Sequence, residues 1–240
     1  MKKILRVFGC GAVLVFVQNL YAQDELNPVK LPDGIKVVRI GDQPTGPPPP
    51  PIYNNTADTG HYFAPDPEAV PVEIADDVIL PDPSVGTAHV NGFEFRYYQP
   101  DPPSFDCVVN FYGALVSSDP LAPDDRPDQT SAVASFTLTG LPGGGIFVID
   151  VDLAGQGTDF DWPASTSSDG CFLNWMGFTF SVNGTGAGLT TATGGGSHDF
   201  IWSNKDLRPP YGTGDGNGFI SSFGGTPEAS FHIKIFGIVN

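Results

Sequence analysis

Basic residues are scarce in this sequence. Its 240 residues include 11 Lys and Arg against 27 Asp and Glu, which gives a formal net charge of -16. Proteins that bind nucleic acid neutralise phosphates with a basic patch, so this composition argues against nucleic acid as a partner. An acidic surface of this kind is compatible with bound divalent cations.

Long stretches rich in Ala, Leu, Glu and Lys are also missing. The chain has 30 Gly and 24 Pro, and only 16% of its residues are charged. Helical bundles and coiled coils need long segments rich in Ala, Leu, Glu and Lys, and they exclude Gly and Pro. The composition therefore favours short strands joined by many turns.

The sequence has no apolar run long enough to span a membrane. The apolar run at residues 7–17 is too short, and it follows three basic residues. A basic segment, an apolar core and a small residue before the cleavage point are typical of a secretory signal peptide. We predict that residues 1–22 are such a peptide, cleaved near Ala22, with a lipoprotein site at Cys10 as the alternative. The mature chain, of net charge -19, is then secreted or lies at the cell surface, with no membrane span.

Cysteine is rare as well, with three in the chain. Cys10 leaves with the signal peptide, so Cys107 and Cys171 remain. Two cysteines in an exported protein favour one disulfide. Two buried free thiols are the alternative, because the sequence does not fix the distance between the two Cα atoms.

Residues 23–51 show no sustained periodicity and end in five consecutive prolines, Pro47–Pro51. A proline run of this kind holds an extended polyproline helix. We predict a disordered, proline-rich linker that spaces residues 52–240 from the cell or a partner. Docking to a proline-reading domain is the alternative.

Beyond residue 52, apolar and polar residues alternate in several short runs. A two-residue period gives a strand one apolar face and one polar face. The clearest runs are Phe93–Tyr97, Cys107–Phe111, Ala134–Leu138, Phe147–Leu153 and Phe231–Ile235, and weaker ones are Glu73–Leu80, Cys171–Phe180 and Asp199–Ser203. Because turn residues separate these runs and no helix is indicated, they predict an all-β domain: an antiparallel β-sandwich or jelly roll of seven or eight strands or more.

The spacing of several of these segments resembles a known group of proteins. The segments are Ile52–Thr56, His61–Phe63, Asp76–Leu80, Val90–Tyr98, Val108–Gly113, Asp199–Trp202 and Ala229–Ile235. Together they resemble bacterial exported proteins of unknown function, many of which carry a PEP-CTERM sorting tail. The resemblance implies a sandwich fold and supplies no activity. No such tail is present in this sequence, so tethering by that route is not expected.

A glycine-rich segment, residues 211–218, contains the best candidate for a metal site. Asp215 and Asn217 stand two positions apart, as oxygen ligands do in the first turn of a calcium loop. The full twelve-residue signature is missing, because no Glu follows at the required place. The sequence predicts Ca²⁺ here, and an ordinary turn capped by Asp and Asn side chains is the alternative.

Loop aromatics supply the candidate ligand-binding residues. Trp162 stands beside Asp159 and Asp161, and Tyr211 stands in the glycine-rich segment. Aromatic rings stack on sugar rings while nearby carboxylates bind hydroxyl groups, so these residues predict a polysaccharide site. The alternative is that Trp162 is an ordinary core residue.

Catalytic patterns are not found. Ser197, His198 and Asp199 are adjacent, and neighbours on an extended chain point to opposite faces, so they cannot form a relay. The four histidines show no ligand spacing, and His232 is expected on the exposed side of the last strand.

Three functional hypotheses follow. The first is a non-catalytic exported or surface module that binds polysaccharide with support from Ca²⁺. The second is a structural or adhesive envelope protein whose partners are surface proteins. The third is a glycan-active hydrolase with paired carboxylates.

Overall fold

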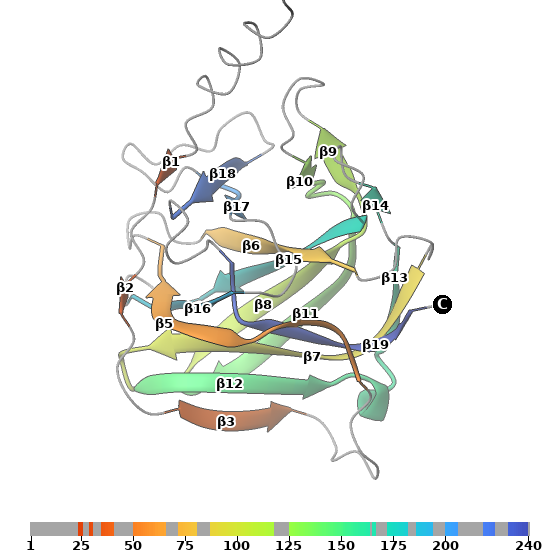
Figure 1. Ribbon diagram of the computed structural model, residues 1–240. Helices are drawn as coiled ribbons and strands as arrows, with labels where there is room; N and C mark the ends of the chain where they lie inside the picture. Colours follow the sequence, from red (N-terminus) through yellow and green to blue (C-terminus); the bar gives the residue numbers. More distant parts are fainter. Residues whose placement is uncertain are drawn as a thin grey trace, which may run out of the picture.

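The structure is a computed structural model, and two β-sheets packed face to face make up its core (Figure 1). It describes residues 24–25, 29–30, 35–40, 50–65, 72–80, 87–117, 125–163, 165–166, 172–181, 186–193, 200–205, 218–223 and 230–239. The predicted β-sandwich is confirmed. Within these residues the only helical turn is the 3-10 turn η2 (Ala154–Gln156), and none of them forms a helix able to cross a membrane.

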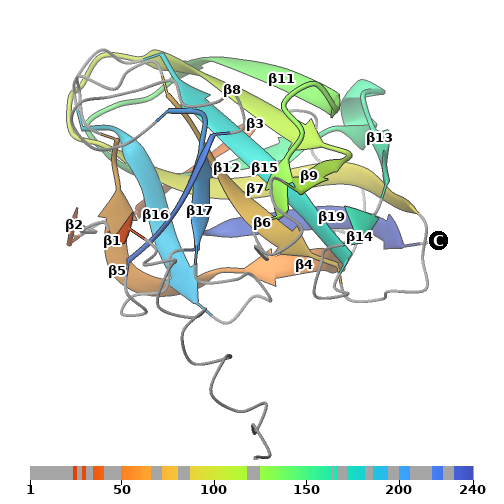
Figure 2. The same cartoon turned by 90° about the horizontal axis from the view of Figure 1, so that it is seen from above.

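The first sheet has eight strands. Seven of them follow the order β1 (Asp24–Glu25), β18 (Phe219–Ser222), β17 (Ile201–Ser203), β6 (Glu73–Ile79), β15 (Phe172–Phe180), β8 (Phe105–Tyr112) and β11 (Ala132–Leu141), and β14 (Ser165–Thr166) pairs with β15. Its pairings are antiparallel except that of β1 with β18. β11 forms one rim of this sheet (Figure 2).

The second sheet has nine strands. Six follow the order β2 (Val29–Lys30), β5 (Ala57–Phe63), β16 (Gly188–Thr193), β7 (Thr87–Gln99), β12 (Gly145–Asp152) and β3 (Ile35–Ile40). β13 (Phe160–Pro163) and β19 (Ile233–Val239) also pair with β7, and β4 (Pro51–Asn55) pairs with β19. A separate hairpin joins β9 (Leu115–Ser117) to β10 (Asp125–Pro127).

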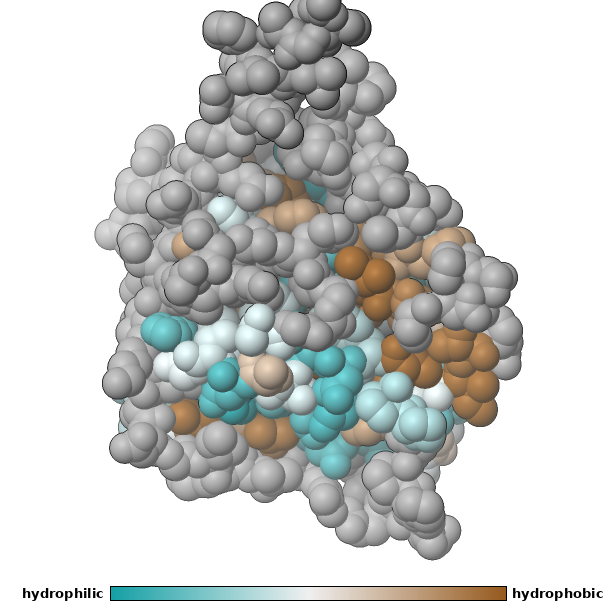
Figure 3. All heavy atoms as spheres, in the orientation of Figure 1, coloured by the Kyte–Doolittle hydropathy of each residue, from teal (hydrophilic) through white to brown (hydrophobic). Residues whose placement is uncertain are grey.

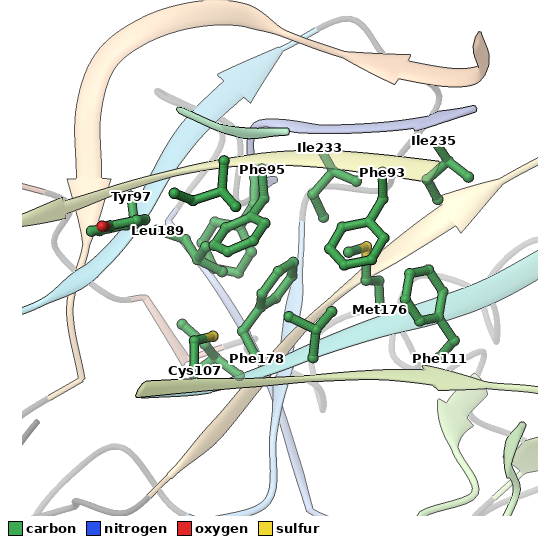
Figure 4. Packing of buried hydrophobic residues seen from close by; sticks show 14 of the residues in the cluster. Phe93, Phe95, Tyr97, Cys107, Phe111, Met176, Phe178, Leu189, Ile233 and Ile235 are labelled. Carbon is green, nitrogen blue, oxygen red and sulfur yellow. The ribbon is translucent and has the colours of Figure 1, made fainter. Parts of the chain in front are cut away.

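Aromatic side chains from both sheets fill the space between them. Figure 4 shows Phe93 and Phe95 of β7 pointing toward Phe111 of β8 and Phe178 of β15. The ring centroids of Phe95 and Phe178 lie 5.0 Å apart, and those of Phe93 and Phe111 lie 5.3 Å apart. These residues occupy the inward positions of the predicted alternation, so the period-two pattern identified the core side of each strand.

The segment expected to be a linker contributes strands instead. β3 pairs in parallel with β12, with Ile35 opposite Ile146 and Ile40 opposite Val151. β1 and β2 pair with β18 and β5. The apolar stretch at residues 35–38 has strand propensity and meets the free edge of β12, and this explains the difference from the prediction. The sandwich therefore begins before residue 52.

The predicted disulfide is not formed, because Cys107 is a free, buried thiol. In the sheet, Cys107 lies opposite Phe180, at the end of β15 remote from Phe172. Phe180 lies eight positions after Phe172 on β15, which is about 26 Å at the usual rise per residue. Cys171 itself lies outside the described residues.

Candidate functional site

The outer face of the nine-stranded sheet carries a continuous group of polar side chains. Because Phe93, Phe95 and Tyr97 point into the core, Glu94 and Arg96 of β7 point outward. We call this group the polar face. It comprises Asp58 and Tyr62 of β5, Glu94, Arg96 and Tyr98 of β7, Thr190 of β16, His232 just before β19, and Lys234 of β19. Figure 3, which views the molecule from this side, shows hydrophilic atoms gathered at its centre.

An ion pair holds one half of the polar face. The Arg96 side chain is only 3% exposed and makes an ion pair with Asp58, whose side chain is 41% exposed. Arg96 Nε also donates a hydrogen bond of 2.7 Å to Thr190 Oγ1. Burial acts to raise the pKa of Asp58, but the hydrogen bonds from Arg96 and from the Gly60 amide outweigh it and lower that pKa. Asp58 is therefore an ionised, fixed carboxylate that still reaches solvent.

Glu94 organises the other half. Lys234 Nζ lies 3.0 Å from Glu94 Oε1, and His232 Nε2 lies 3.3 Å from the same oxygen. Burial acts to raise the pKa of Glu94, but these two partners lower it overall. Burial lowers the pKa of His232, so its imidazole is neutral near pH 7 and donates its Nε2 proton to Glu94.

His232 points away from the core as predicted, but the expected exposure was wrong. The residue is 6% exposed, and its Nε2 contacts Glu94 Oε1. Its Nδ1 is buried and has no hydrogen-bond partner among the described residues.

Two tyrosines lie next to the Asp58–Arg96 pair. The rings of Tyr62 and Tyr98 meet edge to face, with centroids 4.7 Å apart, and both residues are half-buried. Gly188 of β16 lies opposite Tyr98, and a Cβ there would collide with the backbone oxygen of Phe63. The absence of a side chain at this position lets β16 lie close against β5. Burial, followed by the neighbouring Tyr98, raises the pKa of Tyr62.

The structure brings two predicted ligand-binding residues together. Asp159 Oδ2 lies 2.8 Å from Nε2 of His89, and Asp161 Oδ1 lies 2.9 Å from Nδ1 of the same ring. Strand pairing of β13 with β7 places Asp161 opposite His89. The hydrogen bond with Asp161 is the largest cause of the raised pKa of His89.

This cluster does not belong to the polar face. Tyr98 lies nine positions after His89 on β7, which is about 30 Å of strand. Both ring nitrogens of His89 already have carboxylate partners. Among the described residues no group of His, Cys, Asp and Glu is arranged to hold a metal ion.

The surface role predicted for Trp162 is wrong. The indole is fully buried, and its Nε1 donates a hydrogen bond of 2.8 Å to the backbone oxygen of Tyr112. Trp162 alternates with Asp161 on β13, so it points inward where Asp161 points outward. The remaining candidates, Tyr211, Asp215 and Asn217, lie outside the described residues.

A third polar cluster lies on the outer face of the eight-stranded sheet. Glu73 Oε1 accepts hydrogen bonds from Asn110 Nδ2 at 2.8 Å and from the Tyr112 hydroxyl at 2.7 Å. Burial raises the pKa of Glu73, and these hydrogen bonds oppose the rise only in part. Tyr112 also packs against the fully buried Trp202, so this cluster is enclosed by side chains.

The sequence interpretation missed the residues of the polar face. The alternation that identified Phe93, Phe95 and Tyr97 as core residues also places Glu94, Arg96 and Tyr98 on the opposite side. The partners of Arg96 and Tyr98 are on β5 and β16, whose short and irregular patterns were not recognised as strands. Glu94 instead pairs with His232 and Lys234, which lie in a predicted strand.

Comparison of the chain with protein-family models, with curated proteins and with solved structures finds no match.

Proposed function

We propose that this protein is a non-catalytic, exported module that binds carbohydrate through the polar face. The observation that carries the proposal is the Tyr62–Tyr98 pair beside the solvent-reaching carboxylate of Asp58. The resemblance of the sequence to exported sandwich proteins and its predicted signal peptide support the extracytoplasmic location.

The chemistry of this group suits a sugar. A pyranose has apolar faces that pack on aromatic rings and hydroxyl groups at its rim that need hydrogen-bond partners. Tyr62 and Tyr98 offer ring surface, and Asp58 accepts hydrogen bonds from hydroxyl groups. Asp58 is already held by Arg96, so binding immobilises little further side-chain freedom and the entropic cost is low. Because the chain is strongly acidic, we expect neutral rather than acidic glycans.

The protonation of the acids on this face supports binding rather than hydrolysis. A glycosidase needs one carboxyl group with a raised pKa to protonate the leaving oxygen. The pKa values of Asp58 and Glu94 are both lowered, so both are ionised at neutral pH. Glu73 has a raised pKa, but it belongs to the other sheet and is enclosed by Asn110 and Tyr112.

A glycan array with the full chain tests the proposal, in Ca²⁺ and again in EDTA. The full chain is needed because β1, β2 and β3 pair with the sandwich. We expect saturable binding to neutral glycans, lost in Tyr98→Ala and weakened in Tyr62→Ala. Tyr98→Phe, which keeps the ring, should retain most of the binding.

Asp161→Asn is the matched surface control and should bind like the wild type, because Asp161 of β13 lies opposite His89, at the other end of β7 from Tyr98. Loss of binding in EDTA would add a Ca²⁺ requirement and direct attention to Asp215 and Asn217. Absence of binding in both conditions, or equal binding by Tyr98→Ala and wild type, would refute carbohydrate recognition by this face.

A further inference from the structure

We propose that β11 is the docking edge for a second copy of this chain. In the proposed dimer, the two β11 strands pair antiparallel about a two-fold axis at Phe136, and two eight-stranded sheets become one continuous sheet. The inference is independent of the proposed function, because β11 belongs to the sheet that does not carry the polar face.

β11 is a free edge in the part of the chain that the structure describes. Its only strand partner there is β8, and it runs along the rim of the sandwich in Figure 2. Such an edge presents unpaired backbone N–H and C=O groups, which are a template for another strand. Five consecutive residues, Ala134–Leu138, keep a regular register with β8 between two irregularities. This regular stretch is the part able to accept a partner strand.

The regular stretch of β11 lacks the charge or proline that protects other edge strands. Proteins block free edges with charged residues, with proline, with β-bulges, or by keeping the strand short. The two register irregularities of β11 lie outside Ala134–Leu138. The other edge strands have at least one of these features: β1, β2, β3, β10 and β13 contain charged residues, β4 begins with Pro51, and β9 and β14 have three residues or fewer. β11 has ten residues, Ala132–Leu141, with neither a charge nor a proline.

The net charge of the chain allows two copies to associate only through a surface without charged residues, and β11 is such a surface. Two chains of charge -16 repel one another wherever acidic surfaces meet. The exposed side chains along β11 are all uncharged: Ala132, Val133, Ser135, Thr137 and Thr139. Two copies therefore meet there without repulsion between like charges. An antiparallel pair about a two-fold axis also places the same strand on both sides, as closed dimers require.

Phe136 lies on the two-fold axis of the proposed strand pairing. It is half-buried at the open side of the core, with its ring centroid 5.8 Å from that of Phe93 and 6.0 Å from that of Phe111. In the proposed register, the two copies of Phe136 lie directly opposite one another, where side chains of paired strands come into contact. The aromatic core of each copy would then continue into the other.

Charge placement on β11 tests this register. About Phe136, Ser135 of one copy lies opposite Thr137 of the other. Ser135→Lys with Thr137→Lys puts like charges face to face, whereas Ser135→Glu with Thr137→Lys puts opposite charges there. Both double variants lose the hydrogen bond of the Ser135 hydroxyl to Asn110, so they are matched in every respect except the sign at one position.

Sedimentation equilibrium of the full chain over a wide concentration range measures the assembly. We expect a monomer–dimer equilibrium for the wild type, association weakened at least about tenfold in the double-lysine variant, and a retained dimer for the Glu/Lys variant. Equal urea midpoints for the two variants, measured as monomers, would show that both fold. Hydrogen exchange should show that the β11 amides pointing away from β8 become protected as concentration rises.

Three results would overturn the proposal. A wild type that stays monomeric at every concentration would do so. A monomer whose outward-pointing β11 amides, those not bonded to β8, are already protected would do so as well, because another segment of the chain then covers the edge. A dimer that is equally stable in both double variants would place the interface elsewhere.

Discussion

The indole of Trp162 ties the two sheets together through Tyr112. Trp162 belongs to β13 of the nine-stranded sheet, and its Nε1 donates a 2.8 Å hydrogen bond to the backbone oxygen of Tyr112, the last residue of β8 in the other sheet. The ring also packs edge to face on Phe111, with centroids 5.1 Å apart. This side chain therefore joins the two sheets at this end of the sandwich.

We predict that Trp162→Phe destabilises the fold without affecting carbohydrate binding. The variant keeps an aromatic ring in the core but leaves the Tyr112 oxygen without its buried donor, at a cost of about 1–3 kcal/mol. Trp162→Ala should cost more, about 3–5 kcal/mol, because it also leaves a cavity. Urea unfolding followed by circular dichroism measures both values. A loss of sugar binding at full stability would contradict the buried position of this side chain.

His89 should make stability fall as the pH rises. Its pKa in the folded protein is raised above 6.5, chiefly by the hydrogen bond with Asp161 and further by Asp159. A raised pKa means that the stabilisation is fully present below about pH 6.5 and is lost as the pH rises through the folded pKa. Urea midpoints across this range should show the decline in wild type, and His89→Asn should remove it. The effect should shrink in high salt, because the cluster is partly exposed.

His232 should act in the opposite direction. Burial lowers its folded pKa below 6.5, so its contribution is present above pH 6.5 and is lost as the pH falls through the folded pKa. The wild type should lose stability as the pH falls below 6.5, and we expect this loss to be smaller in His232→Gln. The same urea titration measures both proteins. His89→Asn serves as its control, since that variant should leave the acid side unchanged. A common response of both variants would contradict the opposite pKa shifts of the two histidines.

Cys107 should be unreactive until the protein unfolds. The thiol is fully buried, and burial, with a smaller contribution from Glu73, raises its pKa, so little thiolate forms and no reagent reaches it. In a Cys171→Ser variant freed of the signal peptide, a thiol reagent should label Cys107 in denaturant and not in the native state. Labelling of the native variant would contradict the burial of Cys107. In the non-reduced wild type, a Cys107–Cys171 linkage found by intact-mass analysis would contradict the free thiol.

The two-residue alternation determined several of the longer strands and the side of each that faces the core. Phe93, Phe95, Phe111 and Ile233 are buried for the reason that predicted them: successive side chains on a strand point to opposite faces, and one face meets the other sheet. The abundance of glycine and proline, with the absence of helical stretches, was enough to establish an all-β class.

Only the tertiary structure decided which polar residues meet. His89 and Asp161 are 72 positions apart, and the ion pair of Arg96 with Asp58 depends on β16 lying between β7 and β5. A period-two pattern gives the facing of a side chain but not the neighbour or register of its strand. For the same reason Trp162 was predicted to be a surface aromatic and residues 35–40 a linker, whereas strand pairing places one in the core and the other beside β12.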